Sequence, residues 1–222
     1  MVFYVLLAEL VALYFLSRWV TKALFMFFLL IFRARSVAIS LLLVLEFPGT
    51  VIHELAHLFT AEILGVKTGK LRLEPESIRE DDITSGSVMI SESDPFRRYA
   101  RGLAPLFAGI IVLTALSYFL SQALPQWHYW GLGYLMFAVS NSMFSSPADL
   151  KGFIPFAITV GILIASAYFL GIRIALTGQI LEVVTRILTT LTQSLGVVLG
   201  VNVALLFITK LLSHIIGRFL TR

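Results

Sequence analysis

Residues 53–57 read His-Glu-Leu-Ala-His, a set of residue types at a spacing that suits a metal site with a general base. On a helix, positions i and i+4 lie on one face, so the imidazoles of His53 and His57 can approach one tetrahedral zinc ion. Glu54 lies close enough to take a proton from a zinc-activated water. We therefore expect one Zn²⁺ per chain, with Glu54 catalytic. The alternative is that these side chains only satisfy one another inside a helix bundle.

A third protein ligand is expected, because catalytic zinc usually has three protein ligands and a water. Ile63 occupies the position at which one group of zinc proteases has its third histidine. The candidates elsewhere in the chain are Asp149, Glu76, Glu80, Glu92, His128 and His214. Asp149 is favoured, because it follows a helix that should run parallel to the His53 helix and ends at a similar depth.

The elements that position these residues are predicted to be membrane helices. Of the 222 residues, 58% are hydrophobic and only 14% are charged, whereas a soluble domain is nearer to a quarter charged. Several apolar blocks reach the roughly 20 residues that a membrane span needs. We expect an all-α polytopic membrane protein with about six transmembrane helices. The basic residues lie between the apolar blocks, as anchors at the lipid bilayer surface do, which argues against nucleic-acid binding.

Three parts of the chain are predicted. Residues 1–35 form one or two N-terminal membrane helices, and residues 36–152 form a core of three transmembrane helices. Residues 153–222 form C-terminal helices: a span at 153–172, an amphipathic segment at 174–193 and a last span at 195–216. The core helices are expected at 36–64, 103–124 and 130–147.

The segment 66–95 differs from the rest because most of the acidic residues fall there. Residues 70–74 alternate polar and apolar side chains with a period of two, which is typical of a half-buried strand. Residues 87–91 give a second short strand, with turn chemistry between them. We expect a small β-hairpin at the membrane surface after the helix that carries His53.

With these motifs in place, the sequence resembles the site-2 protease family of intramembrane zinc metallopeptidases. The first family signature corresponds to residues 53–57. The second, an Asn followed by a proline-rich turn and an Asp, corresponds to 141–150, read as Asn-Ser-Met-Phe-Ser-Ser-Pro-Ala-Asp-Leu. Phe144 and Leu150 depart from the family pattern and make the turn atypical. The pair Ala104-Pro105 is similar to a Gly-Pro motif of the family's middle core helix.

The resemblance implies a zinc metalloendopeptidase that cleaves transmembrane or membrane-adjacent substrates, in the cell membrane of a prokaryote. It implies that Asn141 binds the substrate backbone or an oxyanion; the alternative is that Asn141 makes an interhelical hydrogen bond. A substrate helix must be extended before hydrolysis, and strand addition would replace its lost backbone bonds; we expect this edge at Leu73 or Met89. The alternatives are a catalytically silent relative that binds membrane segments and another membrane zinc hydrolase.

Overall fold

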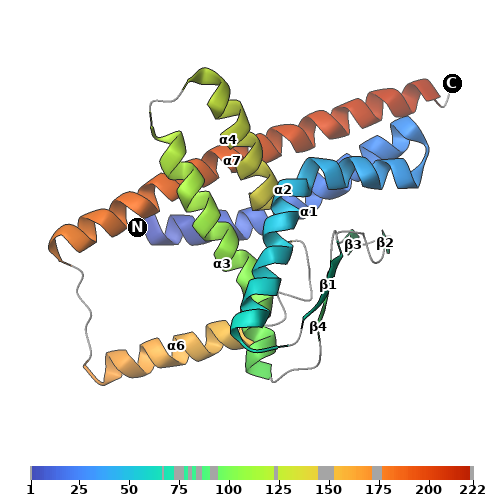
Figure 1. Cartoon of the computed structure of the whole chain (residues 1–222). Helices are drawn as coiled ribbons and strands as arrows, with labels where there is room; N and C mark the ends of the chain where they lie inside the picture. The colour runs from blue at the N-terminus through green and yellow to red at the C-terminus, as the bar shows by residue number, and fades with distance from the viewer. Residues whose placement is uncertain are drawn as a thin grey trace.

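The protein is built mainly of long helices (Figure 1). The computed structural model describes residues 2–66, 68–72, 78–79, 82–83, 87–90, 95–122, 125–144, 153–171 and 177–220. Its helices are α1 (Val2–Phe32), α2 (Arg35–Ile63), α3 (Pro95–Leu120), α4 (Gln126–Ser142), α6 (Phe153–Phe169) and α7 (Gly178–Leu220). Its strands are β1 (Thr68–Arg72), β2 (Ile78–Arg79), β3 (Asp82–Ile83) and β4 (Ser87–Ile90).

Four helices of the described chain are long and apolar enough to cross a membrane: α1, α2, α3 and α7. The chain is therefore a multi-pass, membrane-embedded helical protein, as its composition predicts. The helices α4 and α6 have 17 residues each. At 1.5 Å per residue they rise about 26 Å, slightly less than the roughly 30 Å of a hydrocarbon core. The expected total of six spans remains a prediction.

The two ends of the chain form longer helices than the sequence indicated. α1 is one continuous helix of 31 residues, which settles the choice between one and two N-terminal helices. α7 is also continuous, over 43 residues, so the separation into 174–193 and 195–216 was wrong. The polar residues in its first half change its character, but no proline interrupts it. Single glycines cost only about 1 kcal/mol and do not end a helix.

Short strands follow α2. β1 pairs antiparallel with β4, with Leu71 opposite Val88 and an irregular register between Thr68 and Leu71. β2 pairs with β3 inside this segment. Both pairs are two-stranded, and β1 and β4 contact α2. The single hairpin predicted for 70–74 and 87–91 and its place at a membrane surface stay predictions.

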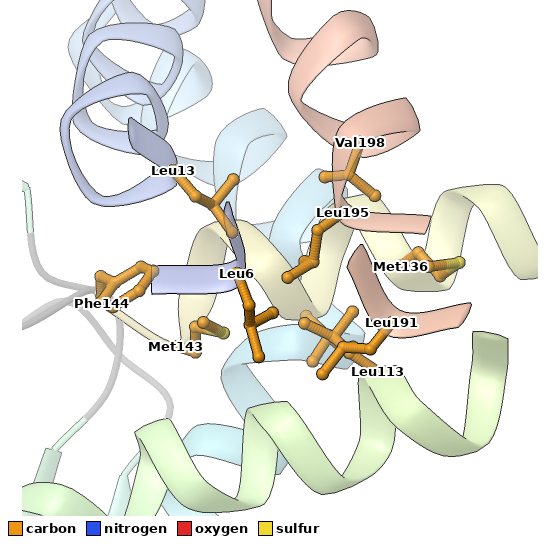
Figure 2. Packing of buried hydrophobic residues seen from close by; sticks show 10 residues of the cluster. Leu6, Leu13, Leu113, Met136, Met143, Phe144, Leu191, Leu195 and Val198 are labelled. Carbon is orange, nitrogen blue, oxygen red and sulfur yellow. The ribbon is translucent and has the colours of Figure 1, made fainter. Parts of the chain in front are cut away.

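The apolar core joins the N-terminal and C-terminal helices to the middle of the chain. One cluster combines α1, α3, α4 and α7 around Leu13, Leu113 and Leu195, as Figure 2 shows. A second cluster combines later residues of α1 with α2 and Phe137 of α4. The early residues of α1 share a cluster with residues 191–198, and its later residues pack with 199–206. α1 and α7 therefore run side by side in the same direction (Figure 1).

α2 approaches α4 very closely at the point where its own hydrogen bonding is interrupted. Pro48 has no N–H for the carbonyl four residues earlier, that of Val44. The Tyr134 hydroxyl of α4 donates to this carbonyl at 3.4 Å. At Gly49, a Cβ atom would collide with the Ala138 carbonyl and the Ser142 hydroxyl. The absence of a side chain at Gly49 thus lets the end of α4 dock one helical turn before His53.

Candidate metal centre

His53 and His57 lie one turn apart on α2, and their rings converge. The Nε2 atoms of the two imidazoles are 3.2 Å apart. The ring centroids are separated by 4.8 Å, with the ring planes nearly perpendicular. His53 is only 3% exposed, and His57 is half-buried. The i, i+4 spacing read from the sequence therefore places the two ring nitrogens at a common point.

A backbone carbonyl of α3 holds the His57 ring in place. The Nδ1 atom of His57 lies 3.1 Å from the carbonyl oxygen of Arg101. A carbonyl only accepts hydrogen bonds, so Nδ1 must carry the proton. In the neutral ring Nε2 then has a lone pair, and this lone pair is directed towards His53. Metal-ligating histidines are usually oriented in this way, by a carbonyl or carboxylate on the other ring nitrogen.

The separation of the two Nε2 atoms suits a shared metal ion. Two nitrogens at 2.0–2.1 Å from a tetrahedral zinc would lie about 3.3–3.4 Å apart. The observed 3.2 Å is close to this value. It also suits a hydrogen bond between the rings, with His53 as donor. The residues therefore fit a zinc ion, and a direct test must distinguish the two arrangements.

Glu54 lies beside the pair and is also buried, at 3% exposure. Adjacent helical positions differ by about 100° in direction, so Glu54 flanks the histidine face rather than sharing it. An ionisable side chain buried in a membrane helix is costly, and it marks a functional site by default. A buried carboxylate next to two convergent imidazoles has the chemistry of a general base.

The described residues narrow the choice of third ligand. Among them, no group of three His, Cys, Asp or Glu side chains could hold a metal ion. His128 stacks on Trp127 at the first turn of α4, at the other end of that helix from Ser142. His214 is exposed near the end of α7. Both positions agree with the preference for Asp149 over these two histidines. The remaining candidates, Asp149, Glu76, Glu80 and Glu92, lie outside the described residues.

Asn141 lies in the last turn of α4 and is 4% exposed. Its Nδ2 atom donates to the Phe137 carbonyl at 2.8 Å. Its Oδ1 atom is buried and has no hydrogen-bond partner within the part of the chain that the structure describes. The neighbouring residue, Ser142, is the one that meets Gly49 of α2. Asn141 is thus close in sequence to the point where α4 docks on α2, with a polar atom available to a further group.

The two predicted strand-edge residues differ in status. Met89 lies in β4, opposite the irregular stretch of β1. Leu73 directly follows β1 and lies outside the described residues. Because the β1–β4 sheet has two strands, each strand has one edge that this sheet does not pair.

Two features of the surroundings were missed by sequence reasoning. The Thr21 hydroxyl of α1 donates to the Glu46 carboxylate at 2.8 Å, so this buried acid joins α1 to α2 two turns before His53. The contact between His57 and the Arg101 carbonyl was also missed, because α3 begins at Pro95 rather than near residue 103. The available signal was Pro105, which removes the helical partner of the Arg101 carbonyl.

No protein-family model matches the chain, and no characterised protein or solved structure matches it either.

Proposed function

We propose that this protein is a zinc-dependent intramembrane endopeptidase, similar to the site-2 proteases, that hydrolyses peptide bonds in or next to transmembrane segments. The observation that carries the proposal is the 3.2 Å approach of the His53 and His57 Nε2 atoms, with the His57 proton held on the opposite nitrogen by Arg101. A multi-pass membrane protein with Glu54 and the two histidines on one apolar helix fits this activity.

In the proposed site His53 and His57 hold the zinc ion, and Asp149 completes its protein ligands. A bound zinc ion supplies Lewis-acid polarisation and a water that is nucleophilic near neutral pH. The stretch of chain between Ser142 and Asp149 is long enough for Asp149 to reach the proposed zinc ion. Asp149 is only seven positions after Ser142, which docks one turn before His53. At about 3.5 Å per residue this stretch spans at most about 25 Å, which covers the distance of one or two helical turns with room to fold back.

Glu54 performs the proton transfers. One carboxylate oxygen takes a proton from the attacking water as the new carbon–oxygen bond forms. The same group then gives the proton to the amide nitrogen as the carbon–nitrogen bond breaks, leaving a carboxylic acid and an amine. Burial of Glu54 excludes competing bulk water from this exchange. Asn141 would donate to, or accept from, the substrate backbone beside it.

The substrate must be extended at the bond that is cut, because a helical peptide bond is hydrogen-bonded and shielded. We infer that the β1–β4 segment offers a strand edge for this, at Leu73 or Met89. Proline at position 73 or 89 removes one backbone donor and disfavours pairing. Cleavage should fall in Leu73→Pro or Met89→Pro while zinc stays bound. Unchanged cleavage in both variants would remove the strand-addition part of the proposal.

The experiment for the main proposal compares the parent protein with Glu54→Gln, both purified in detergent. Zinc content is measured in each, together with cleavage of a panel of single-span substrates. One zinc per chain in both proteins, with cleavage by the parent alone, would support the proposal. Zinc in neither would contradict it. Zinc in both without cleavage by either would favour a catalytically silent membrane-binding relative.

A further inference from the structure

Pro105 lies in the interior of α3 and is fully buried. A proline in a helix has no N–H to donate to the carbonyl four residues earlier, which here is that of Arg101. In a membrane helix a carbonyl without a partner costs several kcal/mol, since no water is present to satisfy it. The Arg101 carbonyl therefore needs a hydrogen-bond donor from outside its own helix.

His57 of α2 supplies this donor. Its Nδ1 donates to the Arg101 carbonyl at 3.1 Å, and the opposite ring nitrogen lies 3.2 Å from His53 Nε2. Pro105 thus makes the Arg101 carbonyl accept a hydrogen bond from another helix. Because His57 donates this bond through Nδ1, its Nε2 keeps the lone pair. The chain of dependence runs from Pro105 through the Arg101 carbonyl to the tautomer and the angle of one imidazole.

We propose that Pro105 is a positioning residue for the metal centre: by freeing the Arg101 carbonyl it fixes His57 as the Nδ1–H tautomer with Nε2 aimed at the site. The consequence for zinc affinity rests on the proposed function. The consequence for the tautomer does not, because it follows from the contact between His57 and Arg101 alone. The two consequences can therefore be tested separately.

The other interior proline of the described core helices makes a suitable comparison. Pro48 of α2 frees the Val44 carbonyl, which accepts a longer bond of 3.4 Å from the Tyr134 hydroxyl. This bond joins α2 to α4 and involves no imidazole. Loss of Pro48 changes the same kind of backbone bond within a membrane helix but does not alter the contact between His57 and the Arg101 carbonyl. Pro48→Ala is thus the matched control for Pro105→Ala.

The decisive variants differ in one backbone atom at position 105. Pro105→Ala restores the N–H and gives the Arg101 carbonyl its helical partner. Pro105→lactate, the ester analogue of that alanine variant, has the alanine methyl group but no N–H. If the freed carbonyl is what matters, the ester behaves like the parent and alanine does not. If ring packing of the proline is what matters, both variants behave alike.

The first readout is the tautomer of His57 in zinc-free protein, from nitrogen-15 NMR of labelled histidine, with His57→Gln used for assignment. The parent, Pro105→lactate and Pro48→Ala should show the Nδ1–H form, and Pro105→Ala should lose it. The second readout is zinc affinity against a competing chelator. Pro105→Ala should bind about 10–100-fold more weakly, the usual effect of removing a partner that orients a metal ligand, and the ester should restore affinity.

An unchanged His57 tautomer in Pro105→Ala would overturn the inference, and so would an ester that behaves like the alanine variant. If the parent shows the expected tautomer pattern but binds no zinc, the positioning role of Pro105 stands and the proposed function fails. If zinc binds and the tautomer does not respond to position 105, the proposed function survives without this device.

Discussion

Two polar positions on α2, Glu46 and His57, lie eleven residues apart and are satisfied in opposite ways. Glu46 accepts a hydrogen bond from the Thr21 side chain of α1, which joins two helices through a closed contact. His57 donates to a backbone carbonyl of α3, and this leaves its second nitrogen directed at His53. The first arrangement uses the polar atom for packing. The second uses one ring nitrogen for packing and directs the other at His53, where the proposed zinc ion would bind.

The largest expected effect is on zinc content, which should differ between a variant of the histidine pair and a variant of Glu46. His53→Ala removes one of two convergent nitrogens, so bound zinc should fall from one per chain to none after dialysis against a weak chelator. Glu46→Gln keeps a group that can accept from Thr21, so it should retain the full zinc content. Elemental analysis of both purified variants gives the comparison. Equal zinc loss in both would show that Glu46 belongs to the metal centre.

The next largest effect is expected at Glu54, which directly follows His53 in the sequence. Glu54→Gln preserves size and polarity but removes the base, so turnover should fall by about 10²–10⁴-fold, the usual contribution of a general acid–base group. Zinc affinity should stay near that of the parent. Single-turnover cleavage of one model substrate measures the change. A loss of less than about tenfold would mean that another group takes the proton.

Gly49 lies between the two positions and tests how the site is supported. In Gly49→Ala the added Cβ meets the Ala138 carbonyl and the Ser142 hydroxyl, so α2 and α4 must separate. Overpacking of this kind costs about 1–3 kcal/mol of stability. Gly133→Ala in α4 is the control, because its Cβ meets nothing within 4 Å. Thermal unfolding in detergent should distinguish them, and equal midpoints would contradict the close approach.

The smallest expected effect is at the structural contact. Thr21→Val keeps the shape of the side chain but removes the donor to Glu46, which should lower stability by about 0.5–1.5 kcal/mol, the usual net contribution of one intramolecular hydrogen bond. Zinc affinity should change by less than about twofold, well below the 10–100-fold seen when a metal ligand loses its partner. A larger loss of zinc affinity would mean that the contact between Thr21 and Glu46 also supports the metal centre.

How far the sequence leads depends on whether a feature is local. The i, i+4 spacing of His53 and His57 fixes their shared face, and the structure confirms that the rings converge. Membrane class follows from apolar length, and it is also confirmed. The continuity of α7 was missed, because polar residues in its first half resemble a separate amphipathic helix although nothing breaks the backbone.

Features that depend on two helices were out of reach. The bond from His57 to Arg101 requires α3 to lie against α2 in one register, and the bond from Thr21 to Glu46 requires the same of α1. Neither register is encoded in a local pattern. The prolines at 48 and 105 do signal freed carbonyls, yet they do not say which side chain will reach them. The role of Asp149 stays a prediction, since it lies outside the described residues.

The central claim is that the two Nε2 atoms meet at a zinc ion, and X-ray absorption at the zinc edge of the loaded, chelator-washed protein tests it most directly. The account predicts one zinc per chain with two imidazole nitrogens at about 2.0–2.1 Å and one or two oxygens at similar distance. No retained zinc, or a zinc shell without two imidazoles, would show that His53 and His57 are hydrogen-bonded to each other and that the metal centre does not exist.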